Sequence, residues 1–236
     1  MTLIEETRMC IADAASLSNS AILFYSGGKD SVCLLDIMYP YFKRIYLVYM
    51  YLVNDLEHIT KYLRYAQKKY PNVVIVRVPH FTLAVNLKYG AFTPKPIKVA
   101  KQTLSSTDKY VRAQLGCPIS FYGMKMADSL ARRLFLRTYE NDMICRATNK
   151  YYPLSKWKQK DVYAYIKNHK LPPTINYGQG RGSGMMLDVK SLAWIRENYP
   201  KDLEKIYATF PLVRNVLIKY DYERNKAEQN GGSKAK

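Results

Sequence analysis

Short apolar runs alternate along the chain with segments in which apolar residues recur every three or four positions. The apolar runs predict five strands, at residues 21–25, 45–53, 73–78, 118–122 and 143–147. The periodic segments predict helices at 2–17, from 31 to about 40, from 55 to 70, and at 106–115, 125–139, 159–168, 188–198, 200–208 and 212–228. Strands that alternate with helices are typical of a parallel sheet covered by helices, so we expect an α/β fold.

The pattern also divides the chain. We expect an α/β domain over residues 1–185, a helical extension over 186–230 and a disordered tail over 231–236. Pro94 and Pro96 break the stretch 80–104, which is expected to form a long connection with a functional role. Asn54 or Asp55 is expected to cap the helix that follows the second strand.

Positive charge is concentrated in the second half of the chain. The net charge is +18; residues 85–137 hold ten Lys and Arg against two acids, and residues 146–183 hold eight against one. A concentration of positive charge of this kind favours phosphate-rich partners, whether a nucleotide, a nucleic acid or another anionic acceptor. The alternative interpretation is that these charges only keep the surface soluble. A protein partner is a further alternative.

The cysteines and the apolar runs limit the class of protein. Cys10, Cys33, Cys117 and Cys145 are far apart in sequence, so there is no C-x-x-C pair, and we expect neither a zinc site nor an iron–sulfur cluster. The longest apolar run has eight residues, which excludes a membrane-spanning helix of the usual length. Without a recognisable secretory leader, a cytoplasmic protein with reduced, structural cysteines is expected.

The sharpest chemical signal is the run Ser26-Gly27-Gly28-Lys29-Asp30-Ser31 directly after the first strand. Two glycines let the chain turn with its amides exposed, and the helix that follows directs its free N–H groups at the same place. Lys29 adds a cation. Asp30 repels phosphate, so it is expected either to cap the helix or to hold a Mg²⁺ ion. The spacing differs from the Walker loop.

S-G-G-x-D-S after a first strand resembles the signature of the PP-loop ATP pyrophosphatase (adenine nucleotide α-hydrolase-like) superfamily. The rest of the chain resembles its phosphoadenosine phosphosulfate (PAPS) reductase and sulfate adenylyltransferase small-subunit branch. Residues 123–132, which read GMKMADSLAR, are similar to that branch's G-x-R-x-x-E-S-x-x-R. Residues 152–157 (YPLSKW), 161–166 (DVYAYI) and 171–172 (LP) resemble a further segment of it. Small chains of this kind resemble those of phages.

The resemblance implies a Rossmann-like (HUP-type) fold, a parallel five-stranded sheet flanked by helices, and a site that binds ATP, or PAPS or its relative APS, with Mg²⁺. It assigns the phosphates to Ser26, Gly27, Gly28, Asp30 and Ser31. It assigns the adenine to the backbone of Tyr49, Met50 and Tyr51. Four residues of the later motif would face the same crevice: Gly123, Lys125, Ser129 and Arg132. The expected catalytic residues are Lys29, Asp30, Lys125 and Arg132, although Arg132 also suits a solvated helix face.

One departure matters. PAPS reductases use a cysteine in a C-terminal segment, and this chain has none after Cys145; where relatives have G-C it reads Gly182-Ser183-Gly184-Met185-Met186. A thiolate must attack the sulfonyl sulfur, so reduction by the usual mechanism is disfavoured. Three functions stay open: cleavage of ATP at the α–β bond with AMP transfer to an anionic acceptor; a PAPS- or APS-binding sulfotransfer or reductase enzyme; and a nucleotide-dependent module that acts with a DNA-acting partner.

Overall fold

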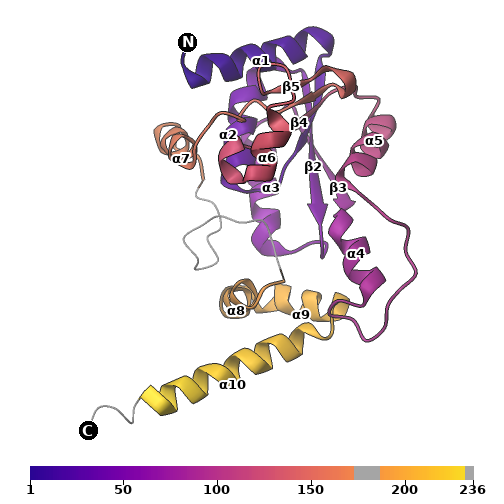
Figure 1. Ribbon diagram of the computed structural model, residues 1–236, viewed down its shortest axis with the longest axis vertical. Coiled ribbons are helices and arrows are strands. Elements are labelled where there is room, and N and C mark those ends of the chain that lie inside the picture. Colours follow the sequence, from indigo (N-terminus) through magenta and orange to yellow (C-terminus); the bar gives the residue numbers. More distant parts are fainter. Residues whose placement is uncertain (173–186, 232–236) are drawn as a thin grey trace.

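A six-stranded sheet forms the centre of the molecule (Figure 1). The structure, a computed structural model, describes residues 1–172 and 187–231. The order of the strands in the sheet is β3-β2-β1-β4-β6-β5, and all neighbours are parallel except β5 and β6. The strands are β1 (Ser20–Phe24), β2 (Arg44–Tyr51), β3 (Val73–Pro79), β4 (Ser120–Tyr122), β5 (Ile144–Cys145) and β6 (Lys150–Tyr151).

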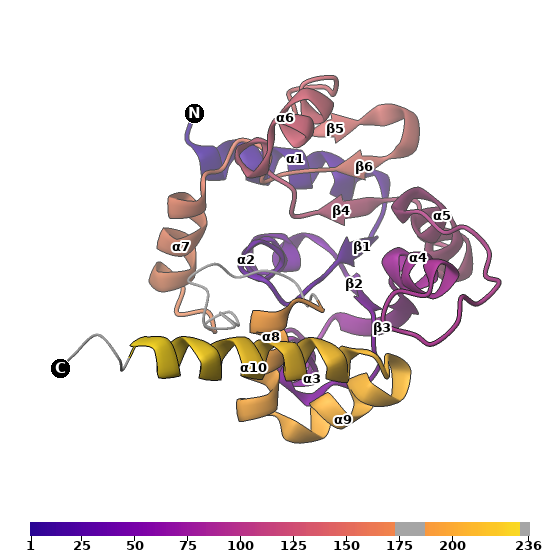
Figure 2. The ribbon, with the colours of Figure 1, turned by 60° about the horizontal axis from the view of Figure 1, so that its bottom comes forward.

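Helices cover the sheet and extend it. In Figure 2, α2 and α7 lie on one side of the sheet, and α4 and α5 lie on the other. The helices are α1 (Leu3–Leu17), α2 (Lys29–Met38), α3 (Glu57–Lys69), α4 (Phe81–Tyr89), α5 (Leu104–Leu115), α6 (Leu130–Leu136), α7 (Gln159–Asn168), α8 (Val189–Asn198), α9 (Pro200–Thr209) and α10 (Val213–Gly231). Short 3-10 turns lie at Tyr39–Tyr41, Met126–Asp128 and Arg146–Thr148.

The centre of the sheet is apolar on both faces. Four of the five β1 residues are buried, which explains why this strand reads as a continuous apolar run. At its end, the ring of Phe24 stacks on that of Tyr122 in β4, with ring centroids 4.8 Å apart. The two strands that carry the predicted motifs are therefore packed side by side, and the loops after them start from fixed points.

The topology creates a crevice at the ends of β1 and β4. The chain runs from β1 outwards through β2 to β3, then returns through α4 and α5 to β4, on the opposite side of β1. Adjacent parallel strands whose connections leave in opposite directions mark the switch point of an open α/β sheet, where ligands bind beyond the carboxyl ends. The segments that start there are the loop 25–28 and the turn 123–125.

The expected α/β, Rossmann-like fold is confirmed, with differences at the far edge of the sheet. The expected fifth strand, 143–147, is β5, and it runs antiparallel; the parallel neighbour of β4 is β6. Strands of two residues are too short to show a period of two. The expected helix 125–139 is shorter and starts at Leu130, because extended Ser129 (φ −166°) caps it by accepting a hydrogen bond from the Arg132 N–H.

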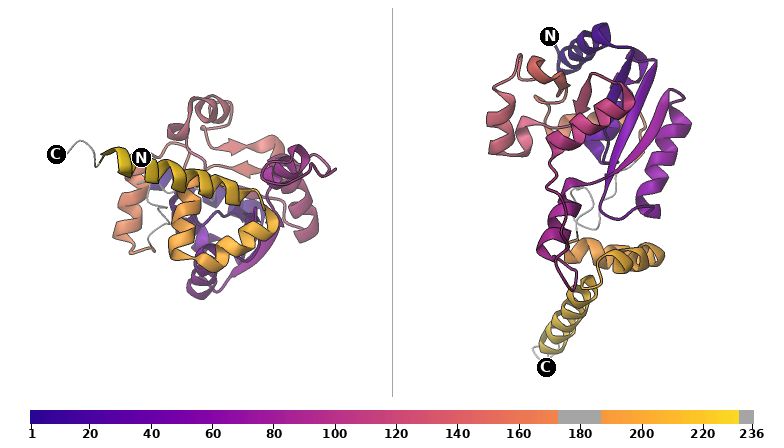
Figure 3. Two further views of the ribbon diagram at one scale, coloured as in Figure 1. Left: turned by 90° about the horizontal axis from the view of Figure 1, so that it is seen from below. Right: turned by 90° about the vertical axis from the view of Figure 1, so that its right-hand side faces the viewer.

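Three helices, α8 to α10, lie across the carboxyl end of the sheet (Figures 1 and 3). Asp202 of α9 ties them to α3: its carboxylate accepts hydrogen bonds from the Glu57 N–H (2.8 Å) and the His58 N–H (3.0 Å), and it lies 2.7 Å from His58 Nδ1. The cap of α3 therefore comes from a distant part of the chain, and the prediction of Asn54 or Asp55 is wrong; the local N-cap residue is Leu56.

Buried apolar side chains of α8 to α10, among them Leu192, Ile206 and Leu217, belong to the same apolar cluster as the sheet. The division of the chain at residue 185 stays a prediction. No helix among the described residues has the length and apolar character needed to cross a membrane. Residues 182–186, which stand where relatives have G-C, and residues 232–236 of the expected tail lie outside the described residues.

Candidate functional site

The loop between β1 and α2 has the geometry of an anion cradle. Gly27 has a positive φ of +72°, which turns the chain where a side chain would be strained. Gly28 is the N-cap residue of α2 and offers no side chain to cap the first turn. The Ser26 and Ser31 hydroxyls lie 3.4 Å apart, and Ser31 Oγ donates to the Gly28 carbonyl at 2.9 Å. The first-turn N–H groups and the positive end of the α2 dipole therefore face the crevice.

The turn after β4 presses against this loop at Gly123. A Cβ placed on Gly123 would lie 3.3 Å from both the backbone carbonyl carbon and the Cβ of Asp30, and 3.4 Å from the Ser31 nitrogen. Those distances are shorter than ordinary carbon contacts, so only glycine lets the two segments approach this closely. The glycine predicted from the second motif thus sets the distance between β4 and the start of α2.

Lys125 forms the electrostatic link between the two segments. Its side chain is 1% exposed, and Nζ lies 2.7 Å from Asp30 Oδ1 and 2.9 Å from Asp128 Oδ1. Among the described residues, neither Asp30 Oδ1 nor Lys125 Nζ has a partner that meets hydrogen-bond geometry, so the two contacts are close ion pairs. A buried ammonium between two carboxylates holds the loop and the turn together.

A row of alternating charges extends from this pair to the surface. Lys29 Nζ lies 3.2 Å from Asp30 Oδ2, and Arg132 donates to Asp128 Oδ2 at 2.5 Å. Burial raises the pKa of the Asp128 carboxyl, but Lys125 and Arg132 lower that pKa by more, so it lies below its usual value. Asp128 therefore stays ionised and holds both cations in place.

Asp30 is not free to act as a simple metal ligand in this arrangement. Both of its carboxylate oxygens face lysines, and a Mg²⁺ ion would have to displace Lys29 or Lys125 to reach one. Among residues 1–172 and 187–231, no group of three or more His, Cys, Asp or Glu side chains is placed to hold a metal ion. The loop does not fit the expected magnesium site, and we derive no step through a metal.

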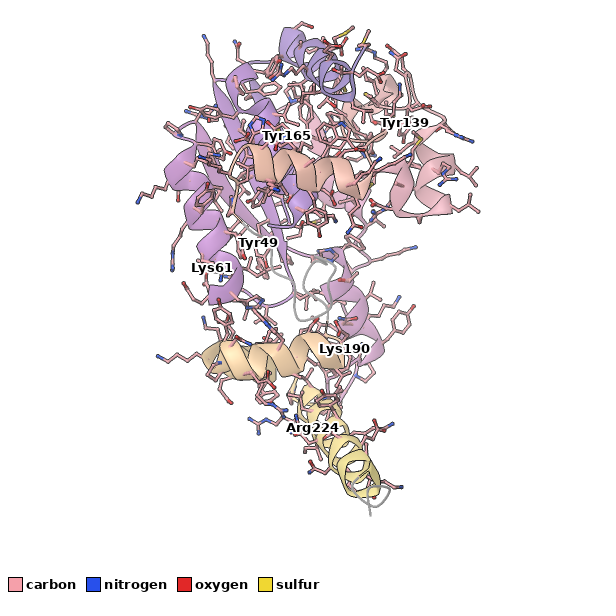
Figure 4. All side chains as sticks on the ribbon, turned by 90° about the vertical axis from the view of Figure 1, so that its left-hand side faces the viewer. Tyr49, Lys61, Tyr139, Tyr165, Lys190 and Arg224 are labelled. Carbon is pink, nitrogen blue, oxygen red and sulfur yellow. The ribbon has the colours of Figure 1, made fainter. Side chains whose placement is uncertain are left out.

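A cavity of about 150 Å³ opens beside the loop, at the ends of β1, β2 and β3. Its lining includes Ser26, Tyr49, Met50, Leu52, His80 and Thr82. Figure 4 shows Tyr49 at the end of the sheet that faces α8 and α9. Burial raises the pKa of Tyr49 to about 12, so its hydroxyl stays neutral. An apolar pocket that adjoins a phosphate loop suits a flat heterocycle.

The backbone of Met50 can recognise such a heterocycle. The Val48 carbonyl accepts from the Tyr25 N–H at 2.9 Å, so the backbone groups of Val48 face β1. Alternate residues of a strand direct their backbone groups to the same neighbour, and those of Met50 therefore point past the end of β1 at Phe24. The Tyr51 carbonyl, by contrast, already accepts from the His80 N–H at 2.8 Å.

The structure brings most of the predicted site residues together, although their roles stay predictions. The loop residues, Gly123 and Lys125 meet at the switch point, and Tyr49 and Met50 line the adjoining cavity. Ser129 and Arg132 lie further out: the Ser129 hydroxyl caps α6, and the Arg132 side chain is 47% exposed and paired with Asp128. Sequence reasoning missed Asp128 as a site residue, although it stands where the branch's motif has glutamate.

A larger cavity, of about 390 Å³, lies between α1 and the β5 region and is lined by residues such as Met9, Cys10, Glu140 and Arg146. Figure 1 shows α1 and β5 at the end of the molecule opposite α8 and α9, away from the carboxyl ends of the strands. This cavity has neither a glycine turn nor the first turn of a helix following a strand, so we place the site at the smaller cavity.

One family model matches most of this chain. Residues 20–210 match the model of the phosphoadenosine phosphosulfate reductase domain, a span that includes the loop, Gly123 and Lys125. The chain belongs to the PAPS reductase domain family. This is a family of enzymes that use adenine nucleotides, within the PP-loop superfamily. None of the curated proteins matches this chain in sequence.

Two solved structures are similar to this chain at low sequence identity. The U34-tRNA thiolase NcsA from Methanococcus maripaludis, with its [4Fe-4S] cluster, is 13% identical, with 91% of this chain and 78% of NcsA covered and a TM-score of 0.45. The NH3-dependent NAD synthetase from Campylobacter jejuni, in complex with nitrate, is 12% identical, with 94% and 96% covered and a TM-score of 0.47. Neither likeness bears on the reaction of this chain.

One cofactor expectation is corrected by these likenesses. The lack of a C-x-x-C pair led to the expectation of no iron–sulfur cluster, yet a structure similar to this one, NcsA, carries a [4Fe-4S] cluster. The expectation that a chain of this kind holds no cluster is therefore withdrawn.

Proposed function

We propose that this PAPS reductase family member binds ATP at the 26–31 loop and cleaves it between the α- and β-phosphates. The observation that carries the proposal is the uncapped first turn of α2, which follows two glycines at the switch point of the sheet. A helix N-terminus of this kind binds the phosphates of a nucleotide without further charged groups.

The proposed nucleotide lies with its base in the cavity and its phosphates on the loop. The Met50 N–H and C=O, which point past the end of β1, suit the donor and acceptor edge of adenine. The amides at the start of α2 and the Lys29 ammonium suit the β- and γ-phosphates. This placement directs the α-phosphate towards the crevice between the loop and Gly123.

In the proposed reaction, an oxygen of an anionic acceptor attacks the α-phosphorus. The new bond joins that oxygen to phosphorus, and the bond from the α-phosphorus to the oxygen bridging to the β-phosphate breaks, so that its electron pair leaves with pyrophosphate. The amides of α2 and Lys29 stabilise the charge that develops on pyrophosphate. Lys125 acts through Asp30, as a positioning residue that keeps the loop in place.

A sulfonucleotide is the second candidate ligand, because the matched family is named for PAPS. Reduction of its sulfo group needs an accessible thiolate. Cys10, Cys33 and Cys117 are buried, and burial raises the pKa of Cys10 to about 12 and that of Cys33 still higher. Cys145 is half-buried, in β5 at the far edge of the sheet. These positions support nucleotidyl transfer over thiol-dependent reduction.

Calorimetric titration with ATP and with PAPS tests the choice of ligand. The proposal expects ATP to bind and the Gly28→Val variant, whose side chain occupies the cradle next to Ser26 Oγ, to lose that binding. Circular dichroism checks that the variant is folded. Binding of PAPS without binding of ATP would replace the proposed reaction by sulfo transfer.

A further inference from the structure

Five lysines form an exposed band over α4, the connection 90–103 and α5. We name this band the lysine surface; its residues are Lys88, Lys95, Lys98, Lys101 and Lys109, all exposed. The α4 and α5 helices lie on the same side of the sheet, and the connection between them runs along that side in an extended path (Figures 1 and 2). The five charges therefore follow one side of the molecule instead of surrounding it.

The charge of this band is not neutralised by nearby acids. Asp108 is the only acidic residue between Phe81 and Lys125. It is buried and already engaged, because it lies 3.1 Å from Arg112 Nε, 2.5 Å from Ser120 Oγ and 3.4 Å from Lys150 Nζ. In the described part of the chain, none of the five lysines has a carboxylate within ion-pair distance. An unpaired row of ammonium groups suits a polyanion.

The other basic stretch differs in this respect. Of its residues, Arg146 pairs with Asp13 and Glu140, Lys150 lies near Asp108, and Lys156 pairs with Glu6. Three of the seven basic residues of 146–172 therefore have carboxylates of the protein itself close by. Lys158, Lys160, Lys167 and Lys170 of this stretch are exposed and lie on and beside α7, away from α4 and α5.

Exposed aromatic rings lie within the same band. Tyr89 is 72% exposed and Tyr110 is 60% exposed, and Lys88 Nζ lies 5.6 Å from the centre of the Tyr89 ring. Exposed tyrosines among lysines provide stacking platforms for unpaired bases, which a duplex keeps hidden. The combination favours a single strand over a double helix.

The lysine surface is continuous with the nucleotide site. Thr82, in the first turn of α4, lines the cavity at the end of the sheet, and His80 caps the same helix by accepting from the Thr82 N–H at 3.1 Å. A nucleic-acid strand bound along α4 in the direction of the N-terminus of that helix would therefore reach the proposed ATP site.

We propose that the lysine surface binds a single-stranded nucleic acid and brings it to the site as the anionic acceptor. The proposed binding depends only on the features of the lysine surface, whereas the role of the nucleic acid as acceptor rests on the proposed function. Because the lysine surface contacts phosphates, binding is expected to weaken as salt is added. The logarithm of the binding constant is expected to fall with the logarithm of the salt concentration, with a slope of about 0.7 per phosphate contacted. Single-stranded DNA and single-stranded RNA both offer the phosphates and unpaired bases that this surface suits.

The test is fluorescence anisotropy with labelled 20-nucleotide single strands of DNA and RNA and a duplex of the same length. The variant K95Q/K98Q/K101Q is compared with K160Q/K167Q/K170Q, which removes the same charge from exposed positions of α7 and of the turn that follows it. The first is expected to weaken single-strand binding about 100-fold at 0.1 M salt, and the second to change it little. Y89A/Y110A is expected to weaken it about tenfold without changing the salt slope.

An equal loss in the two triple variants, or a preference for the duplex that the tyrosine variant does not change, would overturn the proposed surface. ATP binding by the same variants is measured separately by calorimetry. If single strands bind as expected while ATP does not bind, the nucleic-acid surface is supported and the proposed reaction is rejected. If ATP binds and single strands do not, the ATP site is supported and the nucleic-acid surface is rejected.

Discussion

The buried ammonium of Lys125 lies 2.7 Å from Asp30 Oδ1 and so joins the turn after β4 to the phosphate loop after β1. These two segments are 95 residues apart in sequence and meet only because β1 and β4 are neighbours in the sheet. The pair therefore places the loop at the switch point, where a nucleotide is expected. Its role is one of position, since Lys125 does not reach solvent.

Lys125→Met tests this role. The substitution leaves Asp30 and Asp128 without their shared cation, and loss of one partner from a buried ion pair is expected to lower the free energy of unfolding by about 2 kcal/mol, since both carboxylates are partly exposed. Urea unfolding measures the change, and calorimetry measures a parallel loss of ATP affinity. Arg132→Gln is the control: its exposed ion pair is expected to contribute less than about 1 kcal/mol. An unaltered stability and affinity of Lys125→Met would contradict the assignment.

Gly123→Ala tests the close approach of the two segments. The new methyl group would lie 3.3 Å from Asp30 backbone and side-chain carbons, so α2 must move and ATP binding is expected to fall about tenfold. Gly116→Ala is the matched control, because it introduces a strained positive φ of +59° but meets no atom within 4 Å. Equal ATP affinities of the two variants would show that the contact at Gly123 is unimportant.

Stability is expected to fall between pH 7 and pH 5. Burial lowers the pKa of His58 by more than Asp202 raises it, so below about pH 6.5 the unfolded chain takes up a proton that the folded chain does not. Burial also lowers the pKa of His80, with the same sign. Although burial raises the pKa of Asp202, its hydrogen bonds lower it by more, so its contribution is present above pH 3.8 and is lost only as the pH falls further.

The check is urea unfolding of the wild type and of His58→Asn over this pH range. The variant is expected to be less stable at pH 7 and to depend less on pH between 7 and 5. The remaining dependence is expected to come from His80. A dependence as steep as that of the wild type would place the titrating group elsewhere.

Much of the fold could be predicted because its signals are local. The apolar runs of β1, β2 and β3 and the glycines after β1 are visible in sequence without knowledge of any distant contact. The cap of α3 could not be predicted, because it is the carboxylate of Asp202, 145 residues from Glu57. The two-residue strands β5 and β6 also lack a local signal, since their pairing depends on their position beside β4.

The candidate site was predictable to the same extent. The motifs name Lys125 and Asp30 but do not show that the two charges face one another. They suggest that Lys125 is a cation open to the crevice, whereas the structure has it in a buried ion pair. The difference matters physically, because an ammonium between two carboxylates offers little net charge to a phosphate. The sequence identifies the groups, whereas the sheet order determines which of them meet.

Cysteine chemistry separates the two candidate reactions. With Cys10, Cys33, Cys117 and Cys145 all replaced by alanine, ATP cleavage is expected to persist, because Cys33, the cysteine nearest to the loop in sequence, is buried in α2. Alkylation of the native protein is expected to label the half-buried Cys145 before the three buried cysteines, as mass spectrometry can measure. Loss of all activity in a cysteine-free variant that still folds would favour a thiol-dependent sulfonucleotide reaction.

Cleavage of the α–β bond is tested most directly by following the α-phosphate of ATP. The protein is incubated with [α-³²P]ATP, with and without a single-stranded oligonucleotide, and the products are separated by thin-layer chromatography. We expect labelled AMP or a labelled oligonucleotide together with one pyrophosphate per turnover, and no product with Gly28→Val. Labelled ADP, or labelled AMP produced equally by Gly28→Val, would contradict cleavage of the α–β bond at this loop.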